Sequence, residues 1–449
     1  MRAACFALAF WAAATSAGAE TVELGPEQLL QAGYLALDAG DAARAYDYAR
    51  ALVQRDPTDL SAQLLKSRAA RDLGLNDDAK AAARAAWAQA ETRAEQHSTA
   101  LVMAQAYSSA GERMAAQFWL RRAVQKAPDD ASRQRAMQDF AYVKSRMPFV
   151  WQLDVSVAPS SNVNNGTSAQ TMEILGYPFT ISGDAQALSG VEATFSLSGA
   201  YRFLPRENSA TELTFAVQNQ QVFLSSEAKT LAPEARGSDY AFEAYEFGVL
   251  HRWRPGDAPV IGSVAVTAGH NRYGGEGLSD YVNLVLGAER LMGEHTIAFG
   301  NITAERQYRL DEGYRSANLA GANLGVLQTF DNGDQLRIAA GTLLVDSESI
   351  EIDHRAWSAT LGWEKAQPIG GIGLGAGLAL ITRDYAASPY TNDGRQDVRV
   401  AGTVSATLLE VGYMGFNPVL NLTMSRNSSN VDLYDQRDFG VNFGIASAF

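Results

Sequence analysis

The second half of the chain alternates apolar and polar side chains residue by residue, which is the pattern of half-buried β-strands. Near residue 150 the apolar positions are Trp151, Leu153, Val155 and Val157, and the residues between them are Gln152, Asp154 and Ser156. The same alternation places Phe195 and Phe215 on one face of later segments and Ser196 on the other. We therefore predict strands with one apolar and one polar face.

The last twelve residues repeat this alternation up to the final residue. The apolar positions are Phe439, Val441, Phe443, Ile445 and Phe449, and the positions before Phe449 that lie between them are small or polar. Such a strand, ending on an aromatic residue, is typical of the last strand of outer-membrane β-barrels. We predict that Phe449 acts as an assembly signal that the barrel assembly machinery reads.

Turn signals divide residues 147–449 into about fourteen antiparallel strands, and an even number is the rule for bacterial outer-membrane barrels. Short turns are expected near 204–208, 254–257, 292–295, 331–334 and 367–371. Longer polar links are expected at 160–188, 224–238, 271–279, 309–314, 346–354, 386–396 and 427–436. Aromatic residues near strand ends are expected to form membrane-interface girdles: Tyr201, Phe203, Trp253, Tyr281, Trp357, Trp363 and Tyr413. A large soluble β-sandwich or propeller is the alternative.

Residues 20–146 have a different composition, rich in Ala, Leu, Gln, Arg and Asp, which favours helices. Gly40 and Gly74 are 34 residues apart, and so are Ala45 and Ala79. A third unit follows at an offset of 37 and contains Gly111. A period of 34 is that of tetratricopeptide repeats, in which small residues allow two helices to pack closely. An unrelated array of helical hairpins is the alternative.

Three such units would form a short α-solenoid with a concave face lined by the first helix of each unit. The residues expected there are Tyr34, Leu37, Leu64, Arg68, Arg71, Leu101, Gln105 and Ser108. We predict that this face binds a peptide or protein client, although each residue could instead belong to the core or to a solvated surface. The predicted fold class is therefore α + β in two domains, a short tetratricopeptide-like solenoid followed by a transmembrane barrel.

The first nineteen residues have the features of a secretory signal peptide: Arg2, an apolar run from Ala3 to Ala14, and the small residues Ala17-Gly18-Ala19. Residues 1–19 are therefore expected to be removed, residues 20–146 to form a periplasmic domain, and residues 147–449 to form the outer-membrane barrel. The formal net charge of −13 argues against nucleic acid as a partner. Outer-membrane lipid is an expected partner.

This order of domains resembles the surface lipoprotein assembly modulator family, whose members have a signal peptide, a periplasmic tetratricopeptide domain and a fourteen-stranded barrel. The segment after the first predicted strand, with Ser161, Asn162 and Asn164, resembles the Ser-Asn-x-Asn segment that ends the first barrel strand in that family. The helical part is shorter than the family pattern. The resemblance implies that the chain delivers a client lipoprotein or small secreted protein to the cell surface.

Two other functions remain open. An exopolysaccharide exporter also joins tetratricopeptide repeats to a barrel, and a passive porin could carry a periplasmic adaptor domain. A porin would need a constriction loop, for which the links at 160–188 and 224–238 are candidates.

The sequence offers little for catalysis. His97, His251, His270, His295 and His354 form no H-E-x-x-H motif, and there is no P-loop, dinucleotide motif or G-x-S-x-G. The acidic residues around His354 and the pair His270 and Asp280 are expected to be solvated loop charges. We expect no enzyme activity, no cofactor and no metal.

Overall fold

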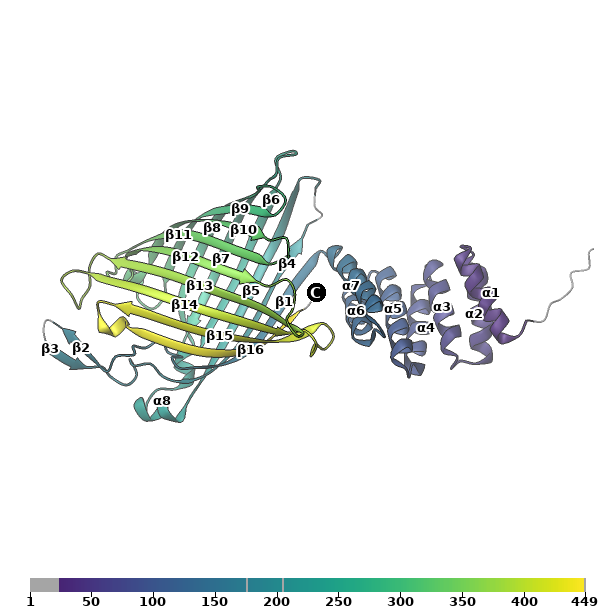
Figure 1. Ribbon diagram of the computed structural model, residues 1–449, viewed down its shortest axis with the longest axis horizontal. Helices are drawn as coiled ribbons and strands as arrows, with labels where there is room; N and C mark the ends of the chain where they lie inside the picture. Colours follow the sequence, from purple (N-terminus) through teal and green to yellow (C-terminus); the bar gives the residue numbers. More distant parts are fainter. Residues whose placement is uncertain (1–23, 175–176, 204–205, 448–449) are drawn as a thin grey trace, which may run out of the picture. The chain divides into compact units, whose positions relative to one another are not determined.

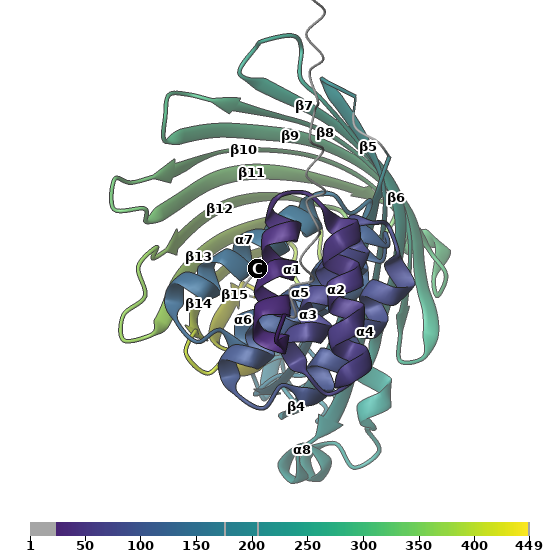
Figure 2. The ribbon, with the colours of Figure 1, turned by 90° about the vertical axis from the view of Figure 1, so that its right-hand side faces the viewer.

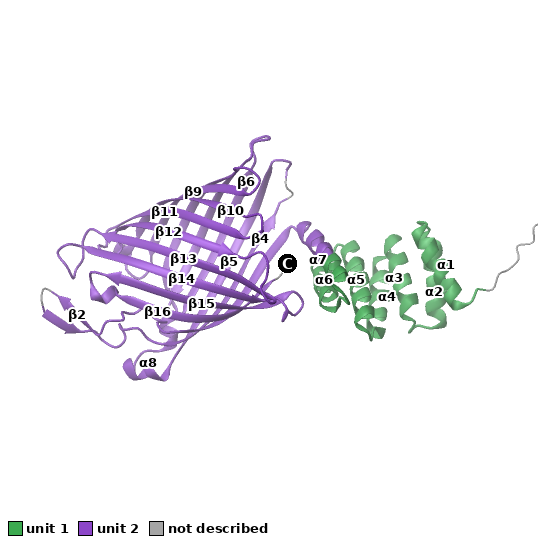
Figure 3. Cartoon of the chain, in the orientation of Figure 1, with its two compact units in different colours: residues 1–136 green, residues 137–449 purple. Residues whose placement is uncertain are grey.

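The computed structural model describes residues 24–174, 177–203 and 206–447, so Phe449 and the predicted signal peptide lie outside the described residues. The chain divides into two compact units, residues 1–136 and 137–449 (Figure 3). The last helix before the barrel ends at Ser145, one residue before the expected domain boundary at residue 146. The division into compact units falls ten residues earlier, inside that helix.

The helical part consists of α-helices joined by short turns (Figure 1). They are α1 (Pro26–Asp38), α2 (Ala42–Arg55), α3 (Leu60–Asp72), α4 (Asn76–Gln89), α5 (Arg93–Ser109), α6 (Arg113–Lys126) and α7 (Asp130–Ser145). Helices α1, α3 and α5 are the first helices of the three repeats, and α2, α4 and α6 are the second. None of the helices in the described part of the chain combines the length and apolarity needed to cross a lipid bilayer.

The repeated residues have the structural roles that their spacing predicts. Gly40, Gly74 and Gly111 each end the first helix of a pair with a positive φ of 81°, 75° and 79°, a conformation that glycine adopts without strain. A methyl group on Gly33 would lie 2.3 Å from the Cδ2 atom of Leu65, so this position requires a small residue where α1 packs on α3. The tetratricopeptide-like packing of this part is therefore confirmed.

The second part is a closed antiparallel barrel of fourteen strands, as the alternation predicts. Figure 2 shows the curved wall that these strands form. Its strands are β1 (Phe149–Ser160), β4 (Gly190–Arg202), β5 (Ser209–Leu224), β6 (Phe242–Trp253), β7 (Val260–Tyr273), β8 (Glu276–Leu291), β9 (Thr296–Arg309), β10 (Ala317–Thr329), β11 (Gln335–Ser347), β12 (His354–Glu364), β13 (Ile372–Tyr385), β14 (Arg395–Leu408), β15 (Phe416–Ser429) and β16 (Gln436–Ser447). Each strand pairs with its neighbours in sequence, and β1 pairs with β16 to close the wall.

The two ends of the barrel differ in the length of their connections. We call the end with links 203–208, 254–259, 292–295, 330–334, 365–371 and 409–415 the short-turn end, and the opposite end the long-loop end. The link 161–189 at the long-loop end contains a separate hairpin of β2 (Thr171–Ile174) and β3 (Tyr177–Thr180). The link 225–241 contains the short helix α8 (Ser226–Leu231).

One expected long link is wrong. Residues 271–279 belong mostly to β7 and β8, which are joined by a turn of two glycines, Gly274 and Gly275. Both have positive φ, 61° and 84°, which suits a tight hairpin with a right-handed strand twist. The polar residues of this segment therefore extend the strands instead of forming a loop.

The face assignment from the alternation is confirmed. In β16, Phe439, Phe443 and Ile445 are between 51% and 58% exposed on the outer face. Gly440, Asn442 and Gly444 alternate with them and face the lumen. One aromatic assignment is wrong: Tyr281 faces the lumen, because Leu284 and Leu286 of the same strand are the exposed, outward residues.

Candidate functional site

The first helices of the repeats place several predicted groove residues next to one another. The guanidinium carbon of Arg68 lies 6.0 Å from the centre of the Tyr34 ring, which connects α3 to α1. Arg71 donates from Nη1 to Oε1 of Gln105 at 2.7 Å, which connects α3 to α5. Burial raises the pKa of Tyr34 above its ordinary value, so its hydroxyl stays protonated at neutral pH. These four side chains form one polar and aromatic face across three repeats, which we call the groove face.

Of the other four predicted groove residues, Leu64 lies in the core. Leu64 is buried and packs in the core with Ala83, Ala86, Val102 and Met103, so its side chain stabilises the repeats and is not open to a client. Leu37, Leu101 and Ser108 are half-buried, as are Tyr34, Arg68 and Arg71, whereas Gln105 is exposed. The charged and aromatic groups among the predicted groove residues are those of Tyr34, Arg68 and Arg71.

The barrel lumen contains a cavity of about 820 Å³ at the short-turn end. Hydroxyl groups and glycines line it, including Thr403, Ser405 and Gly375. Its charged residues include Arg337, whose guanidinium carbon lies 4.1 Å from the centre of the Phe299 ring. Because the lumen-facing positions of β13 in this cavity include glycines, which have no side chains, this part of the lumen is wide. The hydroxyl groups make it polar.

A second lumen cavity of about 440 Å³ lies nearer the long-loop end, between β5 and β9. Two carboxylates face it, Glu246 and Glu305. The Tyr281 hydroxyl donates to Glu246 at 2.5 Å, and the Asn283 amide donates to Glu305 at 3.1 Å. Carboxylates, amides and an aromatic ring together can hydrogen-bond to a polar solute and stack on it.

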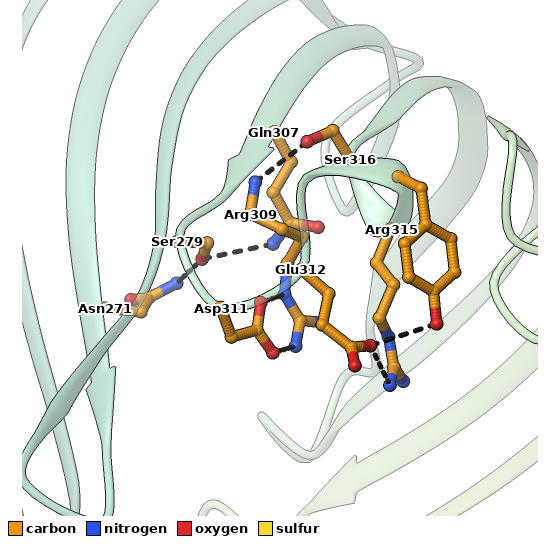
Figure 4. A network of polar contacts seen from close by, with 9 residues as sticks. Asn271, Ser279, Gln307, Arg309, Asp311, Glu312, Arg315 and Ser316 are labelled. Atoms are coloured by element: carbon orange, nitrogen blue, oxygen red, sulfur yellow. Dashed lines mark hydrogen bonds and ion pairs between the residues drawn. The ribbon is translucent and has the colours of Figure 1, made fainter.

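A polar network continues from this cavity toward the long-loop end (Figure 4). The fully buried Ser279 hydroxyl accepts from Asn271 at 3.2 Å and from Gln307 at 3.4 Å, which connects β7, β8 and β9. Arg309 at the end of β9 forms an ion pair with Asp311 in the following link. The network therefore fixes the link 310–316 to the barrel wall.

The long-loop end of the lumen also holds a buried arginine that the sequence did not indicate. The guanidinium carbon of Arg395 lies 3.5 Å from the centre of the Tyr385 ring and 3.7 Å from that of Tyr434. Its Nε atom lies 3.3 Å from a carboxylate oxygen of Asp397, and both side chains are at most 8% exposed. His354 stacks on Tyr385 with ring centres 4.7 Å apart. This cluster joins β12, β13, β14 and the link 430–435.

The segment with Ser161, Asn162 and Asn164 fastens the first long link to the barrel. The side-chain amide of Asn162 bonds in both directions with the backbone of Gly166, at 2.9 and 2.8 Å. Asn164 accepts from the Leu188 backbone at 2.8 Å and donates to two backbone carbonyls of the link. The Ser161 hydroxyl accepts from the backbone N–H of Phe439 in β16 at 2.9 Å. We call these residues the first-link clasp.

The two longest links pack together at the long-loop end. Val163 and Leu188 from the first link and Ala228 and Ala232 from the second form a buried cluster with Val222 and Leu224. Val222 and Leu224 belong to the lumen face of β5, since Phe223 between them is exposed. Both candidate constriction segments are therefore attached to the inner side of this end.

The residues considered for catalysis are placed apart from the cavities. His270 contacts Asp280 at 2.7 Å on the outer face, where both are exposed. Within the described ranges, no group of three or more His, Cys, Asp or Glu side chains has the arrangement of a metal site.

Solved structures with similar folds match the two parts separately. The helical part is similar to PcrH, solved in complex with the chaperone binding region of PopD, at 20% identity and a TM-score of 0.25, over 27% of this chain and 91% of that chain. The barrel is similar to the COG4313 outer membrane channel from Pseudomonas putida F1, at 11% identity and a TM-score of 0.32, over 67% and 96% of the two chains. It is also similar to a BenF-like porin from Pseudomonas fluorescens Pf-5, at 9% identity and a TM-score of 0.36, over 67% and 98%.

No protein-family model matches the chain, and no curated protein matches it. The similarities to solved structures therefore concern the fold alone. The barrel itself indicates an outer-membrane location, because a closed antiparallel barrel with an even number of strands and an apolar outer face is the strand architecture of bacterial outer-membrane proteins.

Proposed function

We propose that this protein carries a client protein across the outer membrane to the cell surface, with the solenoid capturing the client and the barrel passing it. In this arrangement the helical part and the short-turn end of the barrel are periplasmic, and the long-loop end is extracellular. The client is a lipoprotein or a small secreted protein. The role is not catalytic and uses no cofactor.

The observation that carries this proposal is the presence, in one chain, of a groove face and a polar lumen. Tyr34, Arg68 and Gln105 lie on successive first helices, the position at which solenoid repeats bind extended ligands. An arginine beside an aromatic ring can hold a carboxylate or a backbone carbonyl while the ring packs on an apolar side chain. The groove face therefore suits an unfolded polypeptide more than a small molecule.

The chemistry of the lumen wall also supports passage of a polypeptide. The wall carries hydroxyls, amides and charges of both signs. Such groups would hydrogen-bond to the backbone of a passing polypeptide whatever its sequence. Client folding outside the cell would make passage irreversible, which removes the need for a nucleotide.

One observation favours the second candidate, export of an exopolysaccharide. The cavity with Glu246, Glu305, Asn283 and Tyr281 has the carboxylate, amide and aromatic groups that sugar hydroxyls and sugar rings contact. A passive porin with an adaptor domain would use the same lumen without the groove face.

Groove-face variants test the proposal in cells. Proteins that disappear from the surface of a strain lacking this gene are first identified by protease shaving and mass spectrometry. The Y34A/R68E variant should then fail to restore them, because both partners of the α1–α3 contact on the groove face are changed. The matched control is Arg50→Glu, since Arg50 is an exposed arginine on α2, away from this face. Restoration by Y34A/R68E would reject client capture by the groove, and an unchanged protein surface in the deletion strain would favour polysaccharide export.

A further inference from the structure

Two arginines lie directly opposite each other on the outer face of the barrel, near the long-loop end. Arg426 of β15 and Arg437 of β16 are register partners on neighbouring strands, and both side chains are exposed (Figure 1). Asn427, beside Arg426 in the chain, is 7% exposed and belongs to the lumen face, so Arg426 points outward. Directly opposite residues have Cβ atoms about 4.5–5.5 Å apart, and like charges at such positions destabilise a sheet. The arginine pair therefore carries a repulsion that an anion between the two side chains would remove.

The carboxylates nearest to the pair along the chain are engaged elsewhere. Asp435, two residues before Arg437, accepts the backbone N–H of Ser429 at 2.7 Å. Asp438 belongs to the lumen face and accepts from the hydroxyl of Ser160 at 3.1 Å. Within the ranges that the structure describes, neither guanidinium of the pair forms an ion pair or a hydrogen bond. Both charges are therefore available to a group from outside the chain.

Other outward arginines at this end of the barrel are accompanied by a carboxylate. Arg306 donates to Asn318 at 3.0 Å and Asn318 donates to Asp346 at 3.5 Å, along a row of register partners in β9, β10 and β11. Arg355 of β12 has Asp384 of β13 as its register partner. The row that contains the arginine pair continues into β14 with an apolar residue instead, because the other register partner of Arg426 is a valine at position 400. The positive charge is therefore least balanced at the arginine pair.

The apolar belt of the barrel begins directly beside the arginine pair. Toward the short-turn end, three apolar pairs follow on the same face of β15 and β16: Met424 with Phe439, Leu422 with Val441, and Leu420 with Phe443. Met424 and Phe439 are 64% and 51% exposed. An arginine at the edge of such a belt can lay its aliphatic stem on apolar surface while its guanidinium reaches the level of the lipid headgroups. The arginine pair therefore lies where headgroups meet the belt.

We propose that Arg426 and Arg437 bind the phosphate of a lipid headgroup in the membrane leaflet at the long-loop end, with the acyl chains of that lipid on the apolar pairs beside them. Guanidinium groups hydrogen-bond phosphate oxygens in a planar, two-pronged geometry, and the opposite charges strengthen these bonds. One phosphate between the two side chains replaces their repulsion by two attractions.

The belt explains why the occupant is a lipid and not a free anion. A soluble phosphate would contact only the two guanidinium groups, whereas a lipid also covers the exposed Met424 and Phe439. Basic residues at the membrane surface are a general means of attracting anionic headgroups. The inference concerns attachment of the barrel to its membrane, so it holds or fails independently of client delivery.

Lipid binding to the purified full-length chain tests the inference. The chain is held in maltoside detergent, which contains no phosphate, and lipid A, a lipid with two phosphate groups, is added while native mass spectrometry counts bound molecules. The R426Q/R437Q variant should bind the first lipid A about tenfold more weakly or worse than wild type, because charge-assisted contacts from two side chains are lost. The matched control is R306Q/R355Q, which removes two outward arginines at the same end and should bind as wild type does.

The urea midpoint of the barrel, read from its faster migration when unboiled, gives a second test that does not depend on lipid counting. Without lipid A, Arg437→Gln should raise the midpoint, because it removes the repulsion from Arg426. With lipid A present the same variant should lie below wild type, because the bound phosphate stabilises only the intact pair.

Equal binding of lipid A by wild type and R426Q/R437Q would overturn the inference. Displacement of lipid A by millimolar inorganic phosphate would also overturn it, since the site would then be one for a free anion. A midpoint shift of Arg437→Gln with the same sign in both conditions would likewise contradict it. Both variants replace exposed residues and should migrate as folded barrels before the titration begins.

Discussion

A single arginine on the outer face of the barrel should destabilise it, whereas the same residue one position away should not. Leu324 is 71% exposed on the outer face of β10, and Asn323 faces the lumen opposite Asn301 and Gly341. We compare Leu324→Arg with Asn323→Arg. Both variants place an arginine on the same strand at nearly the same depth in the membrane. The difference between their free energies of unfolding therefore reports the environment of the two faces.

The structure places Leu324 near the middle of the apolar belt. On the outer face of β10 the belt lies between the polar residues Asn318 and Gln328. Ten residues of strand span about 34 Å at ~3.4 Å per residue. With a tilt of about 40° they cover about 26 Å along the barrel axis, close to the ~25 Å of an outer-membrane apolar band. An arginine at the middle of this band costs about 2–4 kcal/mol, which is roughly a 30- to 700-fold change in the folding equilibrium.

The assay folds each full-length variant into lipid vesicles and titrates it with urea. The folded fraction is read from the faster migration of unboiled barrels in electrophoresis, a signal that the solenoid does not affect. Leu324→Arg should lower the free energy of unfolding by about 2–4 kcal/mol, and Asn323→Arg should change it by less than about 1 kcal/mol. Equal losses, or a larger loss at Asn323, would refute the assignment of faces and with it the membrane orientation of the strands.

Three further predictions concern the solenoid and the first-link clasp. Gly33→Ala should destabilise the solenoid by about 1–3 kcal/mol, since the new methyl group would overlap Leu65, and the helical circular dichroism of the urea-titrated full chain should show this. Asn164→Ala removes four hydrogen bonds within the first long link, so proteases should cut the link 161–189 faster while the barrel stays folded. Backbone and side-chain hydrogen bonds from Thr92 hold the pKa of Glu95 below its ordinary value of 4.5. This contribution to stability is present above pH 4.5 and is lost as the pH falls below it, so wild-type solenoid should lose more stability than Glu95→Gln between pH 5 and 3.

The overall architecture was predictable because each part repeats one physical rule along the chain. Alternation with a period of two places Phe439 and Phe443 on the same face of their strand, and this does not depend on the position of the strand in the barrel. The helical repeats were readable because Gly40, Gly74 and Gly111 mark the same left-handed turn at nearly equal spacing. These signals are local or periodic, so a single sequence carries them.

The orientation of individual side chains was harder to predict. Leu64 occupies the groove position of its repeat, yet it is buried between α4 and α5, because a leucine at that point of the helix can turn into the core. Tyr281 lies near a strand end, where an aromatic suggests a membrane girdle, but the faces of β8 direct it into the lumen. In both cases the residue type fits two environments, and only the packing decides between them.

The side chains that line the lumen and its long-loop end could hardly be predicted from the sequence. Arg395, Tyr385 and Tyr434 come from three separate segments, and no short motif joins them.

The central claim is that the solenoid and the barrel together deliver a client to the cell surface. The most direct test is quantitative surface proteomics of intact cells that lack the gene, complemented either with the whole chain or with a chain whose residues 20–146 are deleted behind the same signal peptide. We predict that the whole chain restores a small set of surface proteins, and that the barrel alone inserts in the outer membrane but leaves those proteins in the periplasm. Equal restoration by both chains would contradict capture by the solenoid, and a protein surface that is the same with and without the gene would contradict client delivery altogether.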